Sequence, residues 1–201
     1  MLTRARLIVA ALAVVLAGPA AAQDWPTRPI KIVVPFAAGG NVDVTTRIVG
    51  ESLHALLGQP IVADNKTGAG SMIGSEAVAH AAPDGYTLLM TSASLINSPA
   101  LFNRTPYDWK KDFTFITAVS FQPLVVLVNP SNPAKDFASF LDAAKQAPGK
   151  MTMGTAGAGS FPHLAGMLLE QRTGVKFEAV HYRGTAPSLA EIGRASCRER
   201  V

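Results

Sequence analysis

Residues 30–50, IKIVVPFAAGGNVDVTTRIVG, constrain the possible fold more than any other stretch of this chain. A short β-branched run stops at Pro35 and opens into two alanines and two glycines, after which apolar residues recur at helical spacing. We expect a strand, a loop of small residues, and then a helix at 42–57 with Asn41 or Asp43 at its N-cap. The first backbone N–H groups of such a helix lack partners and carry partial positive charge, so this loop can receive an anion.

The rest of the chain repeats this alternation of short apolar runs and helical patterns. The patterns predict strands at 30–34, 61–65, 86–90, 113–119, 124–129, 151–154 and 177–181. They predict further helices at 73–81, 136–146, 162–173 and from 187 onward, and loops at 66–71, 91–98 and 157–161. Strands that alternate with helices indicate βαβ units, and therefore an α/β fold with a mainly parallel sheet.

The first 22 residues have the features of an export signal. Arg4 and Arg6 precede an apolar run at 7–17 that is too short to span a bilayer, and three alanines follow at 20–22. We expect cleavage after Ala22 and a mature protein in a bacterial periplasm. The alternative is a buried N-terminal helix.

The last residues, 191–201, end in IGRASCRERV, which resembles an in-frame translation of a sequencing-adapter oligonucleotide. We therefore expect the genuine sequence to be interrupted at Ala190 or Glu191, and the residues after Ala190 to be unpacked. The alternative is a natural basic tail. The only cysteine, Cys197, lies in this tail, so we expect neither a disulfide framework nor a thiolate nucleophile nor a zinc cluster.

The charge balance gives no reason to expect a nucleic acid or an anionic membrane surface as partner. The whole chain has a formal net charge of +4, with 18 basic and 14 acidic residues. Without the signal and the suspect tail, 13 basic and 12 or 13 acidic residues remain, so the mature segment is close to neutral.

Six motifs, in this order, resemble the substrate-binding proteins of tripartite tricarboxylate transporters, also called Bug or TctC-type receptors. They are PFAAGGNVD (35–43), KTGAGSMIGSEAVAHAAPDGYTLL (66–89), NSPALF (97–102), VLVNPSNPAKDFASFL (127–141), GTAGAGSFPHLAGMLLEQRTG (154–174) and HYRGTAPSLAE (181–191). The resemblance implies a type II periplasmic-binding-protein fold, with two lobes of parallel-rich sheet flanked by helices. It places the first lobe at 23–122 and an incomplete second lobe at 123–190.

The same resemblance implies a non-enzymatic receptor that needs no cofactor or metal and is a monomer when full length. Its two lobes close around a small organic carboxylate, which it delivers to the permease subunits of a membrane transporter. In such proteins two loops hold the ligand carboxylate, chiefly through backbone N–H groups and water. The matching positions here are Phe36, Ala37, Ala38, Gly39, Gly40 and Asp43 in one loop, and Thr155, Gly157, Gly159, Ser160 and His163 in the other.

The residues themselves support this reading of the two loops. Neither loop contains Arg or Lys, so helix termini would supply the positive potential. Asp43 would organise its loop, since a free carboxylate there would repel the ligand. Thr91 and Ser92 end a strand at the sheet edge where open α/β sheets bind ligands. Arg183 also follows a strand, and its side chain faces either the cleft or solvent.

A secreted serine hydrolase that uses Ser160 and His163 is the alternative function. These residues are three positions apart, so one helical turn can bring them together. However, no G-x-S-x-G elbow surrounds Ser160, and no acid that could orient His163 is evident.

Overall fold

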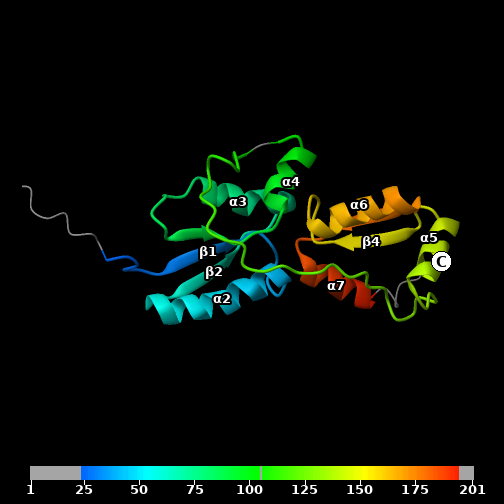
Figure 1. The fold of residues 1–201 in the computed structure, drawn as a ribbon, viewed down its shortest axis with the longest axis horizontal. Helices are drawn as coiled ribbons and strands as arrows, with labels where there is room; N and C mark the ends of the chain where they lie inside the picture. Colours follow the sequence, from blue (N-terminus) through cyan, green and yellow to red (C-terminus); the bar gives the residue numbers. More distant parts are fainter. Residues whose placement is uncertain (1–23, 105, 195–201) are drawn as a thin grey trace, which may run out of the picture.

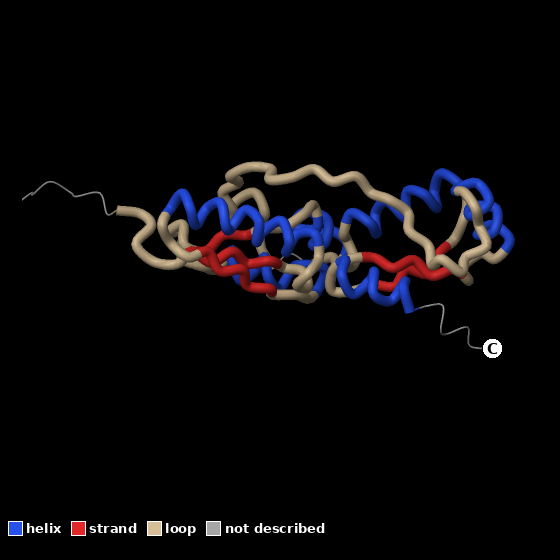
Figure 2. Tube along the Cα trace, turned by 90° about the horizontal axis from the view of Figure 1, so that it is seen from below, coloured by secondary structure: helices blue, strands red, loops and turns tan. Residues whose placement is uncertain are grey.

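The computed structural model describes residues 24–104 and 106–194, and these form two lobes, each built on a parallel sheet (Figure 1). The sheet of the first lobe has the strand order β2-β1-β3, and that of the second lobe pairs β4 with β5. The strands are β1 (Ile30–Val34), β2 (Ile61–Asn65), β3 (Thr87–Leu89), β4 (Met151–Thr155) and β5 (Phe177–His181). Figure 2 shows the two groups of strands following one another along the long axis of the molecule. The α/β prediction is therefore confirmed.

Helices pack on these sheets. In the first lobe they are α2 (Asn41–Leu57), α3 (Met72–Ala79), which follows the short 3-10 turn η1 (Ala69–Ser71), and α4 (Ser94–Leu101). In the second lobe they are α5 (Phe137–Gln146), α6 (Phe161–Thr173) and α7 (Thr185–Arg194). In Figure 1, α3 and α2 lie on opposite sides of the first sheet, as α6 and α7 do for the second. None of these helices has both the length and the apolar character needed to cross a membrane.

The central position of β1 in the sheet explains why this part of the chain is apolar apart from Lys31. It pairs in parallel with β2 on one side and β3 on the other, starting from Ile30 opposite Ile61. Ile30, Ile32, Val33 and Val34 are all buried because helices cover both faces of the sheet. This arrangement brings the loop after β1 to the carboxyl edge of the sheet.

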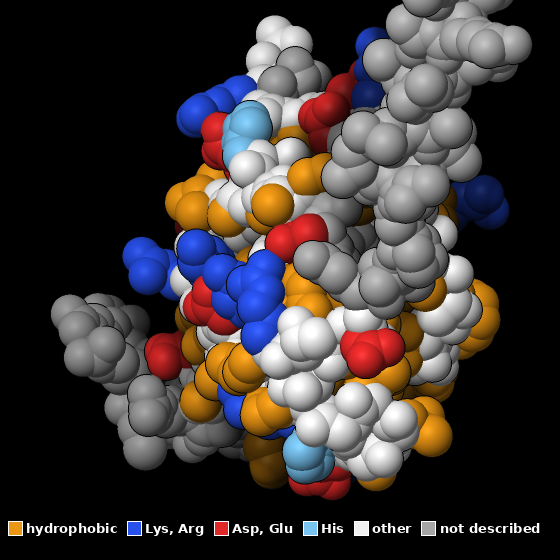
Figure 3. All heavy atoms as spheres, turned by 90° about the vertical axis from the view of Figure 1, so that its left-hand side faces the viewer, with side chains coloured by type: hydrophobic (Ala, Val, Ile, Leu, Met, Phe, Trp, Pro, Cys, Tyr) orange, Lys and Arg blue, Asp and Glu red, His pale blue; other side chains and the backbone are white. Residues whose placement is uncertain are grey.

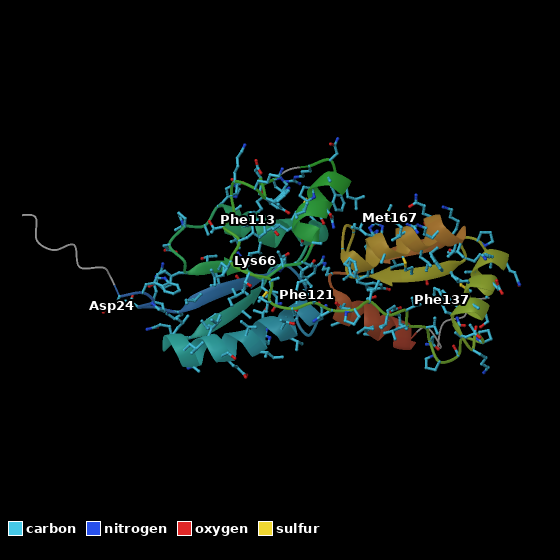
Figure 4. All side chains as sticks on the ribbon, in the orientation of Figure 1. Asp24, Lys66, Phe113, Phe121, Phe137 and Met167 are labelled. Carbon is cyan, nitrogen blue, oxygen red and sulfur yellow. The ribbon has the colours of Figure 1, made fainter. Side chains whose placement is uncertain are left out.

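The predicted strands at 113–119 and 124–129 are wrong. This segment is extended, but it joins no sheet within the part of the chain that the structure describes, and in Figure 2 it passes along both lobes as a loop. Phe121 is 92% exposed and lies where the segment passes from one lobe to the other (Figure 4). β-branched and aromatic residues raise strand propensity, yet a strand also needs a neighbouring strand to pair its backbone groups.

The predicted loop at 91–98 is also wrong in part, because α4 begins at Ser94 and continues past Pro99. Pro99 has no N–H to donate to the Leu95 carbonyl, and the Tyr107 hydroxyl donates to that carbonyl instead, at 2.9 Å. Leu95 and Tyr107 are both buried and share an apolar cluster with Met72. Tertiary packing therefore overrides the weak helix propensity of the serines here.

α7 continues past Ala190 to Arg194, and the expectation that residues after Ala190 are unpacked is wrong at Ile192. The Asn129 side chain donates to the Ile192 carbonyl at 2.7 Å, so the helix is held against the extended segment. Residues 195–201, including Cys197, and the predicted signal at 1–22 lie outside the described residues.

The end of the first lobe that is seen in Figure 3 carries basic and acidic side chains interspersed with apolar ones. One such pair joins Arg28 to Asp84 at 2.8 Å. The face drawn there thus mixes both signs of charge, in keeping with the near-neutral balance of the mature segment.

A glycine sets the packing of α3 on β1. A Cβ added at Gly74 would lie 2.8 Å from the Pro35 Cβ and 2.7 Å from the Lys66 carbonyl oxygen. We predict that Gly74→Ala lowers the free energy of unfolding by about 1–3 kcal/mol through overpacking, as measured by denaturant titration. The matched control is Gly50→Ala on α2, whose Cβ would meet only the Ile61 side chain, at 3.3 Å. Equal losses from the two substitutions would contradict this explanation.

Candidate functional site

The loop after β1 and the start of α7 meet where the two lobes come together. The Ala37 N–H donates to the Arg183 carbonyl at 2.7 Å. A Cβ added at Gly39 would lie 3.8 Å from the Ala186 Cβ, and one added at Gly40 would lie 3.6 Å from the Thr185 nitrogen. The amino-terminal ends of α2 and α7 therefore face each other across this junction, and both bring partial positive charge to it.

A second contact joins the lobes between α4 and the loop that precedes α6. The Ser98 Oγ lies 3.2 Å from the Ala158 carbonyl oxygen. A Cβ added at Gly70 would lie 2.6 Å from the same oxygen. Small residues on both sides thus let the two backbones approach each other closely.

Asp43 organises the first loop from inside the first turn of α2. Its carboxylate is 2% exposed and accepts the Gly39 N–H at 2.8 Å, two Arg47 N–H groups at 3.0 Å, and the Asn65 side-chain amide at 3.0 Å. The hydrogen bond from Arg47 is the main reason why the pKa of Asp43 is lowered from its ordinary value. The N-cap of α2 is Gly40, so the expected cap at Asn41 or Asp43 is wrong. Asp43 instead reaches back from the helix to hold the loop.

The second loop leaves one buried hydroxyl without a partner. Ser160 is the N-cap of α6, is 3% exposed, and makes no side-chain capping bond. Its Oγ has no hydrogen-bond partner among the described residues. A buried polar atom in this state requires an explanation, and a bound ligand provides one.

The neighbouring side chains of this loop are already engaged. The Gly159 N–H donates to His163 Nδ1 at 3.2 Å, and the Gly157 N–H donates to Thr155 Oγ1 at 3.3 Å. Thr155 Oγ1 also lies 2.7 Å from His181 Nδ1. Burial, with repulsion from His181, lowers the pKa of His163, which favours the neutral imidazole that can accept the Gly159 N–H.

This geometry does not form the pair that a serine hydrolase needs. His163 Nδ1 receives the Gly159 N–H, whereas Ser160 Oγ bonds to nothing in the described chain. A nucleophilic serine requires a hydrogen bond to its base, and the base in turn requires an orienting group.

The other residues predicted for the site contribute either their backbone groups or their side chains. Phe36 has a buried side chain, and its carbonyl accepts from Asn65 at 3.0 Å, so only its backbone faces the loop. Ser92 Oγ lies 3.1 Å from Ser94 Oγ. The side chain of Arg183 is exposed, and its carbonyl makes the contact between the lobes.

Sequence reasoning missed three residues around these loops: Arg47, Asn65 and Thr185. Arg47 was detectable, because it lies four residues after Asp43 on the same helix, where opposite charges pair. The others carry no signal in a single sequence. Thr91, expected at the end of a strand, has an Oγ1 without a hydrogen-bond partner among the described residues.

The structure has hollows elsewhere. One of about 460 Å³ lies between α2 and β2 and is lined by Thr46, Arg47, Glu51, His54 and Ile61 among others. A smaller one of about 180 Å³ lies beside α5. Neither includes the predicted loops, where the two lobes are in direct contact.

Comparison with solved structures defines the class of the fold as a periplasmic binding protein. MatC from Rhodopseudomonas palustris, solved with bound malate, superposes with a TM-score of 0.77 at 32% identity, covering 84% of this chain and 57% of its own. The periplasmic binding protein BugD superposes with a TM-score of 0.72 at 32% identity, covering 84% of this chain and 56% of its own. A further R. palustris protein, solved with adipate, gives a TM-score of 0.70 at 30% identity and covers 84% and 57%.

Residues 45–196 match the tripartite tricarboxylate transporter family receptor, and the chain belongs to this family. BugT of Bordetella pertussis is 35% identical over 88% of this chain and 55% of its own length. A protein from the tcbD-tcbE intergenic region of a Pseudomonas species is 38% identical over 84% of this chain and 50% of its own length. The chain therefore spans about half the length of these relatives.

The Asp43 network gives a testable prediction. Asp43→Ala removes a buried charged acceptor and leaves the Gly39 N–H and the Asn65 amide without their partner, which costs about 1–3 kcal/mol of unfolding free energy. Because the folded-state pKa of Asp43 is lowered, its contribution is present above its ordinary pKa and is lost as pH falls through the lowered value. Denaturant titrations at several pH values should therefore show that the free energy of unfolding falls less at acidic pH for Asp43→Asn than for wild type.

The control is Asp84→Ala, which removes the exposed ion pair with Arg28. Exposed pairs contribute about 0–1 kcal/mol, so this variant should lose less stability than Asp43→Ala. Comparable losses would show that the Asp43 network does not stabilise the fold.

Proposed function

We propose that this protein is a periplasmic receptor that captures a small organic carboxylate and delivers it to the membrane permease of a tripartite tricarboxylate transporter. The buried, unpaired Ser160 hydroxyl at the N-terminus of α6 carries the proposal. A carboxylate oxygen is a strong acceptor for such a hydroxyl, and the helix terminus beside it favours negative charge.

The proposed ligand contacts are largely backbone groups. The first turn of α2 presents N–H groups without intrahelical partners, and no cation lies within the loop before it. Arg47 neutralises Asp43 from the outside, so the loop does not present a free negative charge to the ligand. The proposed site consists of Phe36, Ala37, Ala38, Gly39, Gly40, Asp43, Ser92, Thr155, Gly157, Gly159, Ser160 and His163.

Within this set the structure suggests a division of roles. Asp43, Thr155 and His163 hold their loops through bonds to glycine N–H groups. Ser160 is the side chain with free hydrogen-bonding capacity, and Thr91 offers a second such hydroxyl at the end of β3. Two hydroxyls from opposite lobes suit a ligand that is held between them.

Two of the solved relatives hold malate and adipate, which supports a carboxylate as the class of ligand. The periplasmic location follows from the predicted export signal and from the periplasmic proteins that share this fold. The family membership supports delivery to a transporter, and we propose that the protein acts as a monomer.

Ser160→Ala tests this function directly. Because Ser160 Oγ has no hydrogen-bond partner among the described residues, its removal should leave the thermal midpoint unchanged or raise it. A thermal-shift panel of carboxylic acids that includes malate and adipate identifies a binder, and calorimetry should then show about fivefold weaker binding by the variant. Unchanged affinity would remove Ser160 from the site, and a panel without any binder would count against the proposed function.

Gly40→Val tests the first loop separately. Gly40 has φ −76° and ψ 168°, which valine can adopt, but its Cβ would lie 3.3 Å from the Ala37 carbonyl and 3.7 Å from Thr185 Oγ1. We predict at least a tenfold loss of affinity, about 1.4 kcal/mol, with the fold retained. Ala55→Val on the exposed face of α2 is the control and should bind as wild type does. Equal affinity of both variants would remove this loop from the site.

A further inference from the structure

A group of serine hydroxyls connects the end of β3 with the contact between the lobes. Ser92 Oγ lies 3.1 Å from Ser94 Oγ, and Ser71 Oγ donates to Ser94 Oγ at 2.8 Å. Ser75 Oγ donates to the Ser71 carbonyl at 3.0 Å. Ser71, Ser75, Ser94 and Ser98 are all at most 3% exposed, so these bonds form away from water.

These serines support a backbone segment in a conformation that L-residues rarely adopt. Residues 68–71 all have positive φ: 132° at Gly68, 46° at Ala69, 62° at Gly70 and 82° at Ser71. Each non-glycine residue in this region costs free energy, and it persists only where the surroundings hold it in place. The bonds to Ser71 and Gly70 supply that support and place Gly70 against the second lobe.

Ser98 is the serine whose side chain contacts both lobes. Its Oγ lies 2.6 Å from the Gly70 carbonyl oxygen, in its own lobe, and 3.2 Å from the Ala158 carbonyl oxygen, in the other. The hydroxyl has one hydrogen, which it shares between two acceptors. When the lobes separate, the bond to Gly70 remains possible and the bond to Ala158 is lost.

The loop of the second lobe that contacts Ser98 is packed closely against it. A Cβ added at Gly159 would lie 2.5 Å from Ser98 Oγ and 3.0 Å from its Cα, so this approach requires glycine. Ala158 and Gly159 immediately precede Ser160, the start of α6. The Ser98 contact therefore holds the loop that carries the proposed ligand hydroxyl.

We propose that Ser98 is a latch between the lobes, a positioning residue that stabilises their closed arrangement through the Ala158 carbonyl without itself touching the ligand. This deepens the proposed function, because closure of the lobes is what would trap a carboxylate. The contact itself needs no ligand, so it can be tested without one. A ligand that binds the closed arrangement gains apparent affinity as that arrangement becomes more populated.

The test measures the closed population in the ligand-free protein. Glu51 in α2 and Gln171 in α6 are exposed positions on different lobes. Spin labels attached at Glu51→Cys and Gln171→Cys, in a protein whose Cys197 is replaced by serine, report the distance between the lobes. Pulsed electron resonance on this background should show a short distance in wild type. Ser98→Ala should lower the ratio of closed to open molecules about fivefold, which corresponds to about 1 kcal/mol.

Ser75→Ala is the matched control. Ser75 is as buried as Ser98 and also donates to a backbone carbonyl, but its bond stays within the first lobe. Its distance distribution should overlay that of wild type. A shift of equal size in both variants would mean general loosening of the first lobe and would overturn the latch.

A further variant keeps the test decisive if Ser98→Ala folds poorly. Gly159→Ala inserts a methyl group against Ser98 from the other lobe and should open the lobes as well. The proposal would be overturned if the folded Ser98 and Gly159 variants had the same distance distribution as wild type. It would also be overturned if wild type showed only the long distance. None of these outcomes depends on whether a carboxylate binds, so failure of the proposed function is recognised separately.

Discussion

The buried carboxylate of Asp43 is the interaction on which the site depends. It ties the loop after β1 to α2 through Gly39, to the helix surface through Arg47, and to the end of β2 through Asn65. One anion thereby fixes three segments at the carboxyl edge of the first sheet. Because its charge is balanced by Arg47, whose side chain is largely exposed, the loop presents no unpaired negative charge. A cation inside the loop is not required.

Much of the fold could be predicted from the sequence where local signals agree with packing. The run at 30–34 forms β1 with its four apolar side chains buried, and Gly58 ends α2 in the left-handed conformation that favours glycine. Asp136 begins α5 with a capping box in which it accepts the Ser139 N–H at 2.8 Å. In each case the residue type satisfies a backbone requirement that lies within a few positions along the chain.

The errors arose where a distant partner decides the outcome. Residues 113–129 have strand-forming side chains, but pairing depends on a neighbouring strand that these residues alone cannot indicate. α4 depends on Tyr107, which satisfies the carbonyl that Pro99 leaves free. The candidate site shows the same limit: the two glycine loops were recognised by their motifs, whereas the contact of Ser98 with the second lobe became visible only through its three-dimensional neighbours.

The pairing of each sheet within one continuous part of the chain has a consequence for biogenesis. β1, β2 and β3 pair within residues 30–89, and β4 and β5 pair within residues 151–181, so no described ladder joins the two halves of the chain. The first sheet can therefore assemble as soon as its own residues have emerged from the ribosome or a translocation channel. Nascent chains fold domain by domain from the N-terminus, and short sequence separations between paired strands speed that process. The contacts between the lobes then form last, between two pieces that are already folded.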